Sequence, residues 1–555
     1  MIGKRLMALG LAGITALSLA ACGGTSSGGG SGGTAAPSGN GSDTNAAQTE
    51  SGNIKETGKS EGNAAANTEK SDKTLVVSMA AEPANLWSIG TGQQDNQGLM
   101  VQNCIGDSLV NYDFENQEVL PCLATEWEWV DDKRIQFTLR DDVIMNDGTP
   151  LEAADVLYTV KMATEHSANN DSGRYFDYAA CEAVDEHTVI VGMNVVAPDF
   201  MSMLGESAFG IVTEDGVKAA GGVEAAAKNP IMGVGPYKFK EWKSGQYILL
   251  ERNEDYWDKD YVGYYKEIKF NFTNDAATRE MAVESGDAGI ALELPVNLAA
   301  TFMENDAIKT NIYDYDQVMH LFFNCRDGVC ADKKVREAIR SALDIQAIWQ
   351  VATMGYGEIS NGWFMPNGTY YVDVFEGEDR AQDLEKAKQL LAEAGYSDGL
   401  TLKTITAQQL VPTWTVIQEQ LRLAGITLEI GNLDTAQYVT EAKAGNYDII
   451  LTGSAIETRR PSLFTFYQKA NCEDVIGGSK ITTDEIDAKI FQMIETSDTE
   501  EAKTLGGEII RTIKDECWAV DLYTENKAVV MRPNMEGFRR MERGYVDFTT
   551  LYEVQ

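Results

Sequence analysis

The amino-acid sequence predicts an α/β fold, because helical and strand-like patterns alternate along much of the chain. Apolar residues recur at helical spacing in three segments, which are 335–343, 384–394 and 417–424. A glycine ends each of the last two segments and a strand-like run follows it: Gly395 before 400–402, and Gly425 before 427–430. Helices that stop at glycine and are followed by strands are typical of α/β domains, and they indicate such a domain at about 314–524.

Other parts of the chain are predicted to be strands. The runs 75–77 and 318–323 are apolar, as in buried strands, whereas 135–139 alternates apolar and polar residues, as in a half-exposed antiparallel strand. The region 113–228 is richer in hairpin signals, so we expect a separate subdomain there. At 555 residues the chain is long enough for roughly two to four domains.

The composition excludes several classes of function. Acidic residues outnumber basic ones by 85 to 46, for a net charge of -39, so neither nucleic acid nor anionic lipid is an expected partner. Three histidines argue against a multi-histidine metal site and against a Ser-His-Asp enzyme. Within 74–555 neither G-x-S-x-G nor H-E-x-x-H occurs. We therefore expect no enzyme, no catalytic residue, no metal and no cofactor, with an extracellular hydrolase as the disfavoured alternative.

The N-terminus has the features of a signal peptide. The basic pair 4–5 precedes an almost wholly apolar run, 6–21, which is shorter than the roughly 20 residues of a membrane-spanning helix. The run ends in Leu-Ala-Ala-Cys at 19–22, which resembles the lipobox at which bacterial lipoproteins are cleaved and lipid-modified. We expect 1–21 to be removed and Cys22 to carry lipid. An ordinary signal peptide with a chance cysteine is the alternative.

A tether is expected to follow the lipidated cysteine. The segment 22–73 is rich in Gly, Ser, Thr, Asn and Ala and contains no aromatic residue. Such a composition cannot bury enough apolar surface to fold, so the segment should be flexible and reach on the order of 40 Å. A lipid anchor, a tether and a folded body predict a protein held at the extracellular face of a bacterial cytoplasmic membrane.

Seven cysteines follow Cys22 and are therefore available for disulfides in an exported protein. They are Cys104, Cys122, Cys181, Cys325, Cys330, Cys472 and Cys517. Cys325 and Cys330 flank a turn-like spacer, so we expect a local disulfide between them. Two buried thiols are the alternative.

Short motifs follow one another in a characteristic order along the body of the chain. They are LPCLATEW at 120–127, FTLR at 137–140, NDGTPL at 146–151, GVGPYKF at 233–239, RNEDYW at 252–257 and LLAEAGY at 390–396. Together they resemble the signature of the family 5 extracellular solute-binding proteins, the oligopeptide, dipeptide and nickel receptors of ABC importers. The matches extend over nearly all of 74–555, although Met145 and Asn146 stand where the family often has Phe-His.

The resemblance implies a bilobal, periplasmic-binding-protein-like fold with an additional small subdomain and a hinge between the lobes. Lobe I is expected to comprise 74–112, 229–313 and 525–555, with 113–228 as its small subdomain. Lobe II is expected at 314–524. The lobes should close on a ligand and shield it from water.

In peptide-binding members of this family, an Asp that follows a strand and a Gly-Trp step binds the α-amino group of the ligand. The similar stretch here has Gly453 at the glycine, Ser454 at the tryptophan and Glu457 at the aspartate. Glu457 is therefore expected to accept charge-assisted hydrogen bonds from an ammonium, and Arg459 or Arg460 to clamp a ligand carboxylate. The alternative is a solvated ion pair within a loop.

Four further residues are weaker candidates for ligand binding. Asn85 and Trp87 lie in the loop after the first predicted strand, Trp363 lies in a loop that resembles the family's cleft mouth, and Trp414 precedes a predicted helix. The aromatic rings are candidates for stacking on a peptide bond, a side chain or a sugar. Packing in a core is the alternative for each of them.

The resemblance thus implies a monomeric substrate-binding lipoprotein that captures a small solute, in the first place a short peptide, and delivers it to an ABC permease. Nickel is disfavoured because the histidines are only His166, His187 and His320. Two alternatives stay open: an oligosaccharide or a metal chelate as the ligand, and a surface sensor with no role in transport.

Overall fold

The computed structural model describes residues 70–91, 96–113, 118–166, 175–194, 200–205, 207–261, 263–366, 368, 370–406, 410–433, 435–455, 466–473, 475–541 and 544–554. All of them belong to a compact unit that spans Asn53–Gln555. The expected signal peptide, the lipidation site Cys22 and the tether as far as residue 69 lie outside the described residues.

The described strands form one large sheet and several small ones. In chain order they are β1 (Thr74–Met79), β2 (Val110–Asp113), β3 (Glu118–Pro121), β4 (Ala124–Asp131), β5 (Arg134–Leu139), β6 (Glu182–Ala183), β7 (Thr188–Gly192), β8 (Tyr237–Lys243), β9 (Tyr247–Arg252), β10 (Glu267–Phe272), β11 (Ile290–Leu294), β12 (Lys309–Phe323), β13 (Leu400–Thr406), β14 (Ile426–Asn432), β15 (Ile449–Ala455), β16 (Ala519–Met531), β17 (Met535–Glu536) and β18 (Tyr552–Glu553). The large sheet has the order β15-β12-β16-β11-β1-β10-β9-β8. The small sheets are β13-β14, β17-β18, β2-β3 and β4-β5-β7-β6.

Helices alternate with these strands. They are α1 (Ser88–Thr91), α2 (Asn96–Ile105), α3 (Ala153–Glu165), α4 (Phe200–Leu204), α5 (Glu214–Ala220), α6 (Val223–Ala226), α7 (Ala276–Glu284), α8 (Val296–Ala299), α9 (Lys333–Ala342), α10 (Ile345–Thr353), α11 (Leu384–Glu393), α12 (Val411–Leu423), α13 (Thr435–Ala444), α15 (Asp484–Glu495) and α16 (Thr499–Asp515). The mixture of helices and strands confirms the predicted α/β class.

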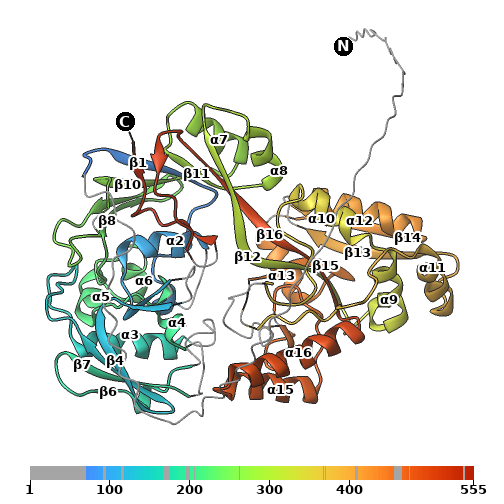
Figure 1. The fold of residues 1–555 in the computed structure, drawn as a ribbon, viewed down its shortest axis with the longest axis horizontal. Helices are drawn as coiled ribbons and strands as arrows, with labels where there is room; N and C mark the ends of the chain where they lie inside the picture. The colour runs from blue at the N-terminus through green and yellow to red at the C-terminus, as the bar shows by residue number, and fades with distance from the viewer. Residues whose placement is uncertain are drawn as a thin grey trace, which may run out of the picture. The chain divides into compact units, whose positions relative to one another are not determined.

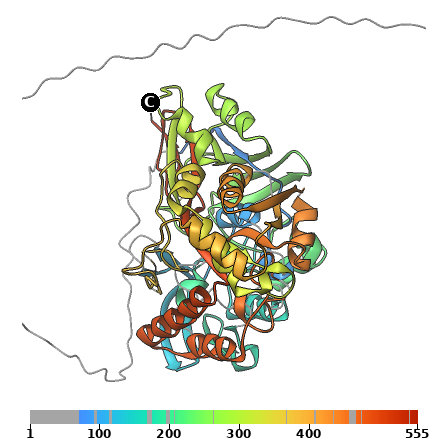
Figure 2. The ribbon, with the colours of Figure 1, turned by 90° about the vertical axis from the view of Figure 1, so that its right-hand side faces the viewer.

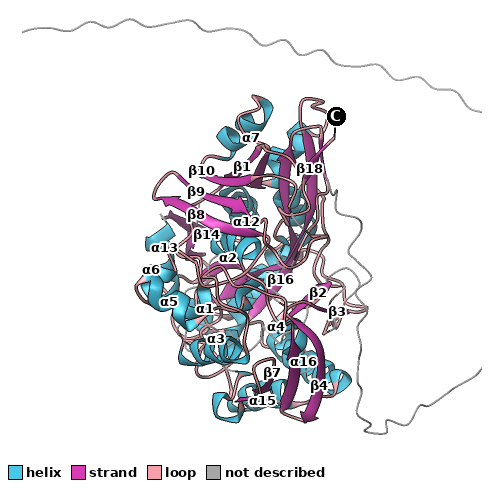
Figure 3. Ribbon diagram, turned by 90° about the vertical axis from the view of Figure 1, so that its left-hand side faces the viewer, coloured by secondary structure: helices cyan, strands magenta, loops and turns pink. Residues whose placement is uncertain are grey.

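The large sheet contains both parallel and antiparallel neighbours. Strand β1 lies between β10 and β11 and runs parallel to both. The other neighbouring strands of this sheet pair in the antiparallel sense. Figure 3 shows β10, β9 and β8 in succession at one end of the sheet.

Apolar side chains gather in two large cores. The first core is built from residues between 75 and 292 together with residues between 529 and 551. The second core lies wholly between 318 and 523. A small third cluster packs side chains of α7 and α8 against β11 and β16. Each large core is the interior of one half of the fold, because apolar burial is the dominant force that holds such a body together.

Strands β12 and β16 contribute to both large cores. They pair with each other from Lys309 opposite Met531 to Phe322 opposite Ala519. Val529 packs in the first core, whereas Phe322 packs in the second. In Figure 1 the two strands, green and red, run side by side from one half of the described body to the other.

The pairing of β12 with β16 is irregular where the two strands pass between the cores. Asp314 lies opposite Asn526 and Val318 lies opposite Thr524, so residues 315–317 of β12 stand against Glu525 alone. Extra residues in one strand bend it and change the direction of its side chains. We call the segment 314–318 the β12 bend.

Helices of the second core agree with the sequence predictions. Asp383 caps α11 by accepting the backbone N–H of Lys386, and Gly395 follows the helix with φ of 90°. Helix α12 begins at Val411, earlier than predicted, because Pro412 occupies the first turn, where a missing N–H removes no helical hydrogen bond. Helices of this half, in yellow and orange, lie toward the viewer in Figure 2.

Candidate functional site

The stretch that the sequence assigns to ligand binding begins at the end of β15. Residues 453–455 of this strand pair with 317–319 of the neighbouring β12. Gly453 and the backbone of Ser454 are therefore beside the β12 bend. The other predicted ligand residues of this stretch, Glu457, Arg459 and Arg460, lie outside the described residues.

Gly453 is needed because a neighbouring side chain crosses the strand there. A β-carbon built on Gly453 would lie 1.8 Å from Nε2 of Gln317, well inside contact distance. Gln317 is one of the extra residues of the β12 bend. A larger residue at position 453 would push the Gln317 amide away from β15, so these two positions depend on each other.

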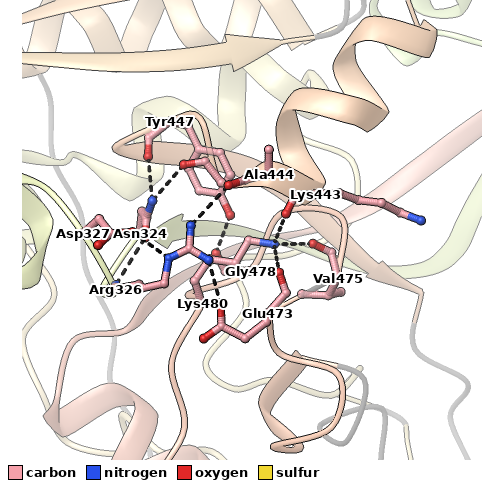
Figure 4. A network of polar contacts seen from close by, with 11 residues as sticks. Asn324, Arg326, Asp327, Lys443, Ala444, Tyr447, Glu473, Val475, Gly478 and Lys480 are labelled. Carbon is pink, nitrogen blue, oxygen red and sulfur yellow. Dashed lines mark hydrogen bonds and ion pairs between the residues drawn. The ribbon is translucent and has the colours of Figure 1, made fainter.

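A polar network holds the chain beyond this stretch (Figure 4). The side chain of Lys480 belongs to a residue only 1% exposed, and its ammonium donates hydrogen bonds to the carbonyl oxygens of Lys443, Glu473 and Val475 at 3.2, 3.1 and 2.5 Å. Its φ of 53° is uncommon for a residue with a side chain. The convergence of three carbonyls on one cation ties the segment 473–480 to the end of α13.

The same network reaches the end of β12. Asn324 donates hydrogen bonds from Nδ2 to the carbonyl oxygens of Gly445 and Tyr447, at 2.9 and 3.2 Å. The guanidinium of Arg326 pairs with the carboxylate of Glu473 at 2.6 Å. The end of β12, the turn before β15 and the segment after the predicted binding stretch are thus held together, as Figure 4 shows.

Helix α2 connects the first core to the β12 bend. Asn96, its first residue, donates a hydrogen bond from Nδ2 to the hydroxyl of Tyr315 at 2.5 Å. The hydroxyl of Tyr545 donates in turn to Oδ1 of Asn96 at 2.9 Å. Because Tyr315 is one of the extra residues of the bend, this hydrogen-bonded chain joins three segments that are far apart in the sequence.

Three charged side chains adjoin this chain of hydrogen bonds. Lys527 lies 3.2 Å from the carboxylate of Glu525 and 4.5 Å from the ring centroid of Tyr315. Both carboxylate oxygens of Glu293 lie within 3.2 Å of Nε2 of Gln97, which donates to them. Burial lowers the pKa of Lys527, but the carboxylates of Glu525 and Glu293 raise it by more, so the pKa ends above its usual 10.5 and the ammonium stays charged.

The backbone of Glu293 is held in an unfavourable conformation. Its φ is 53°, at a point where the pairing of β11 with β16 shifts register. The buried guanidinium of Arg279 donates to the carbonyl oxygens of Leu292 and Glu293 at 3.1 and 2.9 Å. A strained residue persists only where its surroundings enforce the strain, and such residues cluster at functional sites.

Charged side chains of both signs therefore lie beside the β12 bend. Glu525 and Glu293 can accept hydrogen bonds from an ammonium, and Lys527 can pair with a carboxylate. Sequence reasoning missed all three residues. Glu525 and Lys527 lie among other polar residues of their strand, so no local signal singles them out. Only the pairing with β12 shows that they lie beside Tyr315.

Asn85 and Trp87 have structural surroundings. Asn85 is buried, and its side-chain oxygen accepts the backbone N–H of Trp87 at 2.9 Å, which shapes the turn before α1. Trp87 packs in the first core. A β-carbon on Gly90 would lie 2.3 Å from the Trp87 ring, so the helix backbone covers one side of the indole.

Trp363 and Trp414 are fully buried in the second core. Trp363 stacks on His320 with ring centroids 4.4 Å apart and an angle of 19° between the planes. Trp414 lies within α12. The three candidate tryptophans are thus divided between two cores, and the structure does not bring them together on one surface.

The predicted disulfide between Cys325 and Cys330 is not present in the structure, where both residues are free thiols. Each thiol is buried in the second core, and Sγ of Cys325 donates to the carbonyl oxygen of Phe323 at 3.4 Å. Burial raises the pKa of Cys325 to about 12 and that of Cys330 well above its usual value. Thiols that stay protonated react slowly, because the thiolate is the form that forms disulfides.

Two features are absent from the described ranges. Among them, no helix combines the length and the apolar character needed to cross a membrane. Within the same ranges, His, Cys, Asp and Glu side chains do not gather in groups of three or more that would hold a metal ion.

Comparison with known families decides where the chain belongs. Residues 118–473 match the profile of the bacterial extracellular solute-binding proteins, family 5, and this match covers more than half of the 555 residues. The chain belongs to this family. The resemblance that its motifs indicated is therefore confirmed.

Several relatives span most of this family 5 protein. The oligopeptide-binding protein AppA of Bacillus subtilis is 24% identical over 506 residues, which cover 86% of this chain and 91% of AppA. The structure of the periplasmic binding protein DppA of Helicobacter pylori in complex with the peptide STSA has a TM-score of 0.74 at 21% identity, and covers 87% of this chain and 98% of DppA. The structure of AgaA of A. tumefaciens R10 in complex with agropinic acid has a TM-score of 0.72 at 25% identity, and covers 87% of this chain and 99% of AgaA. The predicted bilobal fold of periplasmic binding proteins is confirmed.

Proposed function

We propose that this family 5 protein binds a short peptide or a similar amine-bearing solute outside the cell and delivers it to an ABC permease. One observation carries the proposal: the start of the predicted binding stretch, at Gly453, adjoins the β12 bend, and side chains of both charges lie beside that bend on β16. A peptide with free ends needs a partner for its ammonium and a partner for its carboxylate. AppA of Bacillus subtilis is named as oligopeptide-binding, and DppA of Helicobacter pylori was solved with a peptide, which supports the same class.

Within this proposal, Glu457 accepts the ammonium of the ligand and Arg459 or Arg460 binds its carboxylate. The support is the position of the preceding strand, because β15 ends at Ala455 beside the β12 bend. Glu525 and Lys527 at the bend would add to the same electrostatic environment. Because the lobes close over the ligand, these contacts act in a water-poor cleft, where charge-assisted hydrogen bonds are stronger.

A carboxylated solute other than a peptide is the second candidate. It is favoured by the similar structure of AgaA, which holds agropinic acid. An oligosaccharide has less support, because the tryptophans that would stack on sugar rings lie inside the two cores. A metal chelate has no supporting observation among the described residues.

We further propose that the protein is monomeric, acts without a cofactor and without chemistry, and is anchored by lipid on Cys22 at the extracellular face. The anchor rests on the lipobox-like sequence at 19–22 and on the composition of the tether. A tether of this length would let the folded body capture solute at a distance and still meet the permease.

The test is a binding screen on the purified chain that starts after the signal peptide. Thermal shift and calorimetry would compare short peptides with agropinic acid, oligosaccharides and nickel chelates. We expect saturable peptide binding that is lost when the peptide N-terminus is acetylated. Small-angle scattering should show compaction with the same peptides, because ligand favours the closed lobes.

Two results would contradict the proposal. Tight binding of an uncharged sugar, with no binding of any peptide, would show that the ligand is a sugar and not a peptide. Turnover of a bound peptide by the pure protein would replace a binding role with an enzymatic one.

A further inference from the structure

A cavity lies beside the first core, apart from the predicted binding stretch. Its volume is about 280 Å³, and its walls come from the segment after α2, the loop after β9 and the chain after β17. A buried water takes about 30 Å³ and ligand pockets begin near 300 Å³, so the cavity has room for one side chain or one small molecule.

Acidic groups outnumber basic groups in the wall of this cavity. Four aspartates and two arginines line it: Asp107, Asp258, Asp260, Asp547, Arg140 and Arg539. Each arginine is already close to a carboxylate. Arg140 forms two hydrogen bonds to Asp142, at 2.8 and 2.9 Å, and Arg539 lies 3.8 Å from Asp547.

Asp547 is fully engaged within the wall. It is 1% exposed and accepts hydrogen bonds from the hydroxyls of Tyr261 and Thr549, both at 2.5 Å. The backbone N–H of Thr549 donates to the same carboxylate at 3.0 Å. With Arg539 beside it, this carboxylate has little capacity left for a ligand.

Asp107 is in the opposite situation. Its residue is 9% exposed, and its carboxyl group accepts the indole N–H of Trp257 at 2.7 Å and contacts the hydroxyl of Tyr256. Both partners are neutral. The guanidinium of Arg140 lies over the ring of Trp257, 4.3 Å from its centroid. That guanidinium pairs with the carboxylate of Asp142.

A buried carboxyl group without a cation is costly, and proteins usually pair it or keep it protonated. Burial, reinforced by the nearby carboxylate of Asp258, raises the pKa of Asp107 to about 7. The carboxyl group therefore titrates close to neutral pH instead of well below it. An ammonium that entered the cavity would meet an acceptor that the protein has placed but not neutralised.

The cavity also lies near the β12 bend. Helix α2 runs from Asn96, which binds Tyr315 of the bend, to Asn103 in the cavity wall. The neighbour of Arg539 in the chain, Arg540, donates a hydrogen bond to the carbonyl oxygen of Asp314 at 2.6 Å. Two wall segments of the cavity are thus attached to the bend on which the proposed function rests.

We propose that this cavity binds an alkylammonium group, with the carboxylate of Asp107 as its partner. Two sources would supply that chemistry: a lysine-like side chain of a bound peptide, which rests on the proposed function, or a free diamine or basic amino acid, which does not. In the first case Asp107 is a specificity-determining residue of the receptor. In the second case the cavity is a separate binding site.

Calorimetry with matched ligands tests the inference. The peptides are Ala-Lys-Ala and Ala-norleucine-Ala, which differ by the ammonium, and the free amines are lysine and 1,5-diaminopentane. The variant is Asp107→Asn, which keeps an acceptor for the Trp257 indole. The matched control is Asp131→Asn, which removes one carboxylate from the β4–β5 hairpin, outside the cavity.

We expect wild type to prefer the lysine peptide, or to bind the free amines, and Asp107→Asn to weaken that binding by about tenfold or more, the usual effect of losing a bond to a charged group. Asp131→Asn should behave as wild type. If Asp107→Asn weakens binding of the lysine peptide alone, the ammonium comes from a peptide side chain. If it weakens binding of the free amines, the cavity is a separate site.

Equal binding of the two peptides, together with no binding of either amine, would overturn the inference and leave a cavity that holds water. An amine preference that survives in Asp107→Asn would overturn it as well. Failure of the proposed function is distinguishable, because a chain that binds no peptide at all can still bind the free amines. Proton release on amine binding near pH 7, measured in buffers of different ionisation enthalpy, gives a readout that does not depend on the variant.

Discussion

The side-chain amide of Asn96 donates a hydrogen bond to the hydroxyl of Tyr315 at 2.5 Å. This contact connects the first residue of α2 to the β12 bend, where the two strands shared by both cores lose their regular pairing. It therefore lies at the junction of the two halves of the fold. The first prediction concerns this contact.

Replacement of Tyr315 by Phe removes the hydroxyl and keeps the ring over which Lys527 lies. We expect Tyr315→Phe to lower the free energy of unfolding by about 0.5–1.5 kcal/mol, the usual worth of one hydrogen bond. Peptide affinity should also fall, because the bend is less rigidly held. Urea unfolding and calorimetry measure the two effects. Tyr178→Phe, at an exposed position, is the control, and equal behaviour of the two variants would contradict the prediction.

Lys480 should be among the most sensitive lysines of the second core. Lys480→Met leaves three carbonyl oxygens without their shared, buried donor, so we expect a loss of about 3 kcal/mol in the free energy of unfolding. Peptide binding should weaken too, since the network of Figure 4 holds the chain next to the predicted binding stretch. Lys469→Met, at an exposed ion pair with Asp484, is the control. A change of less than about 1 kcal/mol for Lys480→Met would refute this reading.

Asp107 should make stability depend on pH. Its pKa is about 7 in the folded chain against an ordinary 3.8, so between about pH 4 and pH 7 the folded chain holds a proton that the unfolded chain has lost. The free energy of unfolding should therefore fall as pH rises through this window, by on the order of 4 kcal/mol in total, and should not change further above it.

Comparison with Asp107→Asn isolates this contribution from other titrating groups. The variant should match wild type near pH 4 and exceed its stability at pH 8. Urea unfolding at a series of pH values gives the difference. A difference that stays constant across the series would show that Asp107 keeps an ordinary pKa.

Glu457 is expected to bind the ligand ammonium. Glu457→Gln should weaken peptide binding by about 1.5–3 kcal/mol, the range for a hydrogen bond to a charged group, and leave the free energy of unfolding nearly unchanged. The control is Glu419→Gln, at an exposed pair with Arg422. Wild-type affinity in Glu457→Gln would show that this carboxylate takes part only in a loop ion pair.

Cys22 is expected to anchor the protein. Cys22→Ala removes the sulfur that is expected to carry the lipid, so the protein should appear in the medium or stay uncleaved in the membrane. Fractionation with detection of the folded body measures this. Retention of a processed Cys22→Ala protein at the membrane would mean that another element holds it there.

Local patterns were sufficient to predict several elements. Asp383 and Gly395 mark the two ends of α11, and the structure has the expected cap and left-handed glycine there. Capping and helical spacing act over a few residues, so the chemistry that sets these ends is contained in the segment itself. The order of the family motifs is also visible in the sequence, and it predicts the α/β bilobal fold. The disulfide at Cys325 and Cys330 was wrong, because spacing cannot show that a core encloses both thiols.

The residues that surround the β12 bend could not be predicted in the same way. Asn96, Tyr315 and Glu525 are separated by about two hundred residues each along the chain, and each is unremarkable in its own segment. Tyr315 lies beside both of the others because the pairing of β12 with β16 is irregular between the two cores, and no local signal sets that pairing. Asp107 is a similar case: an aspartate is ordinary in a sequence, and only its burial against Trp257 makes it an uncompensated acid. Long-range pairing and burial depend on the whole chain at once, which is why the contacts of the candidate site emerge only in the folded protein.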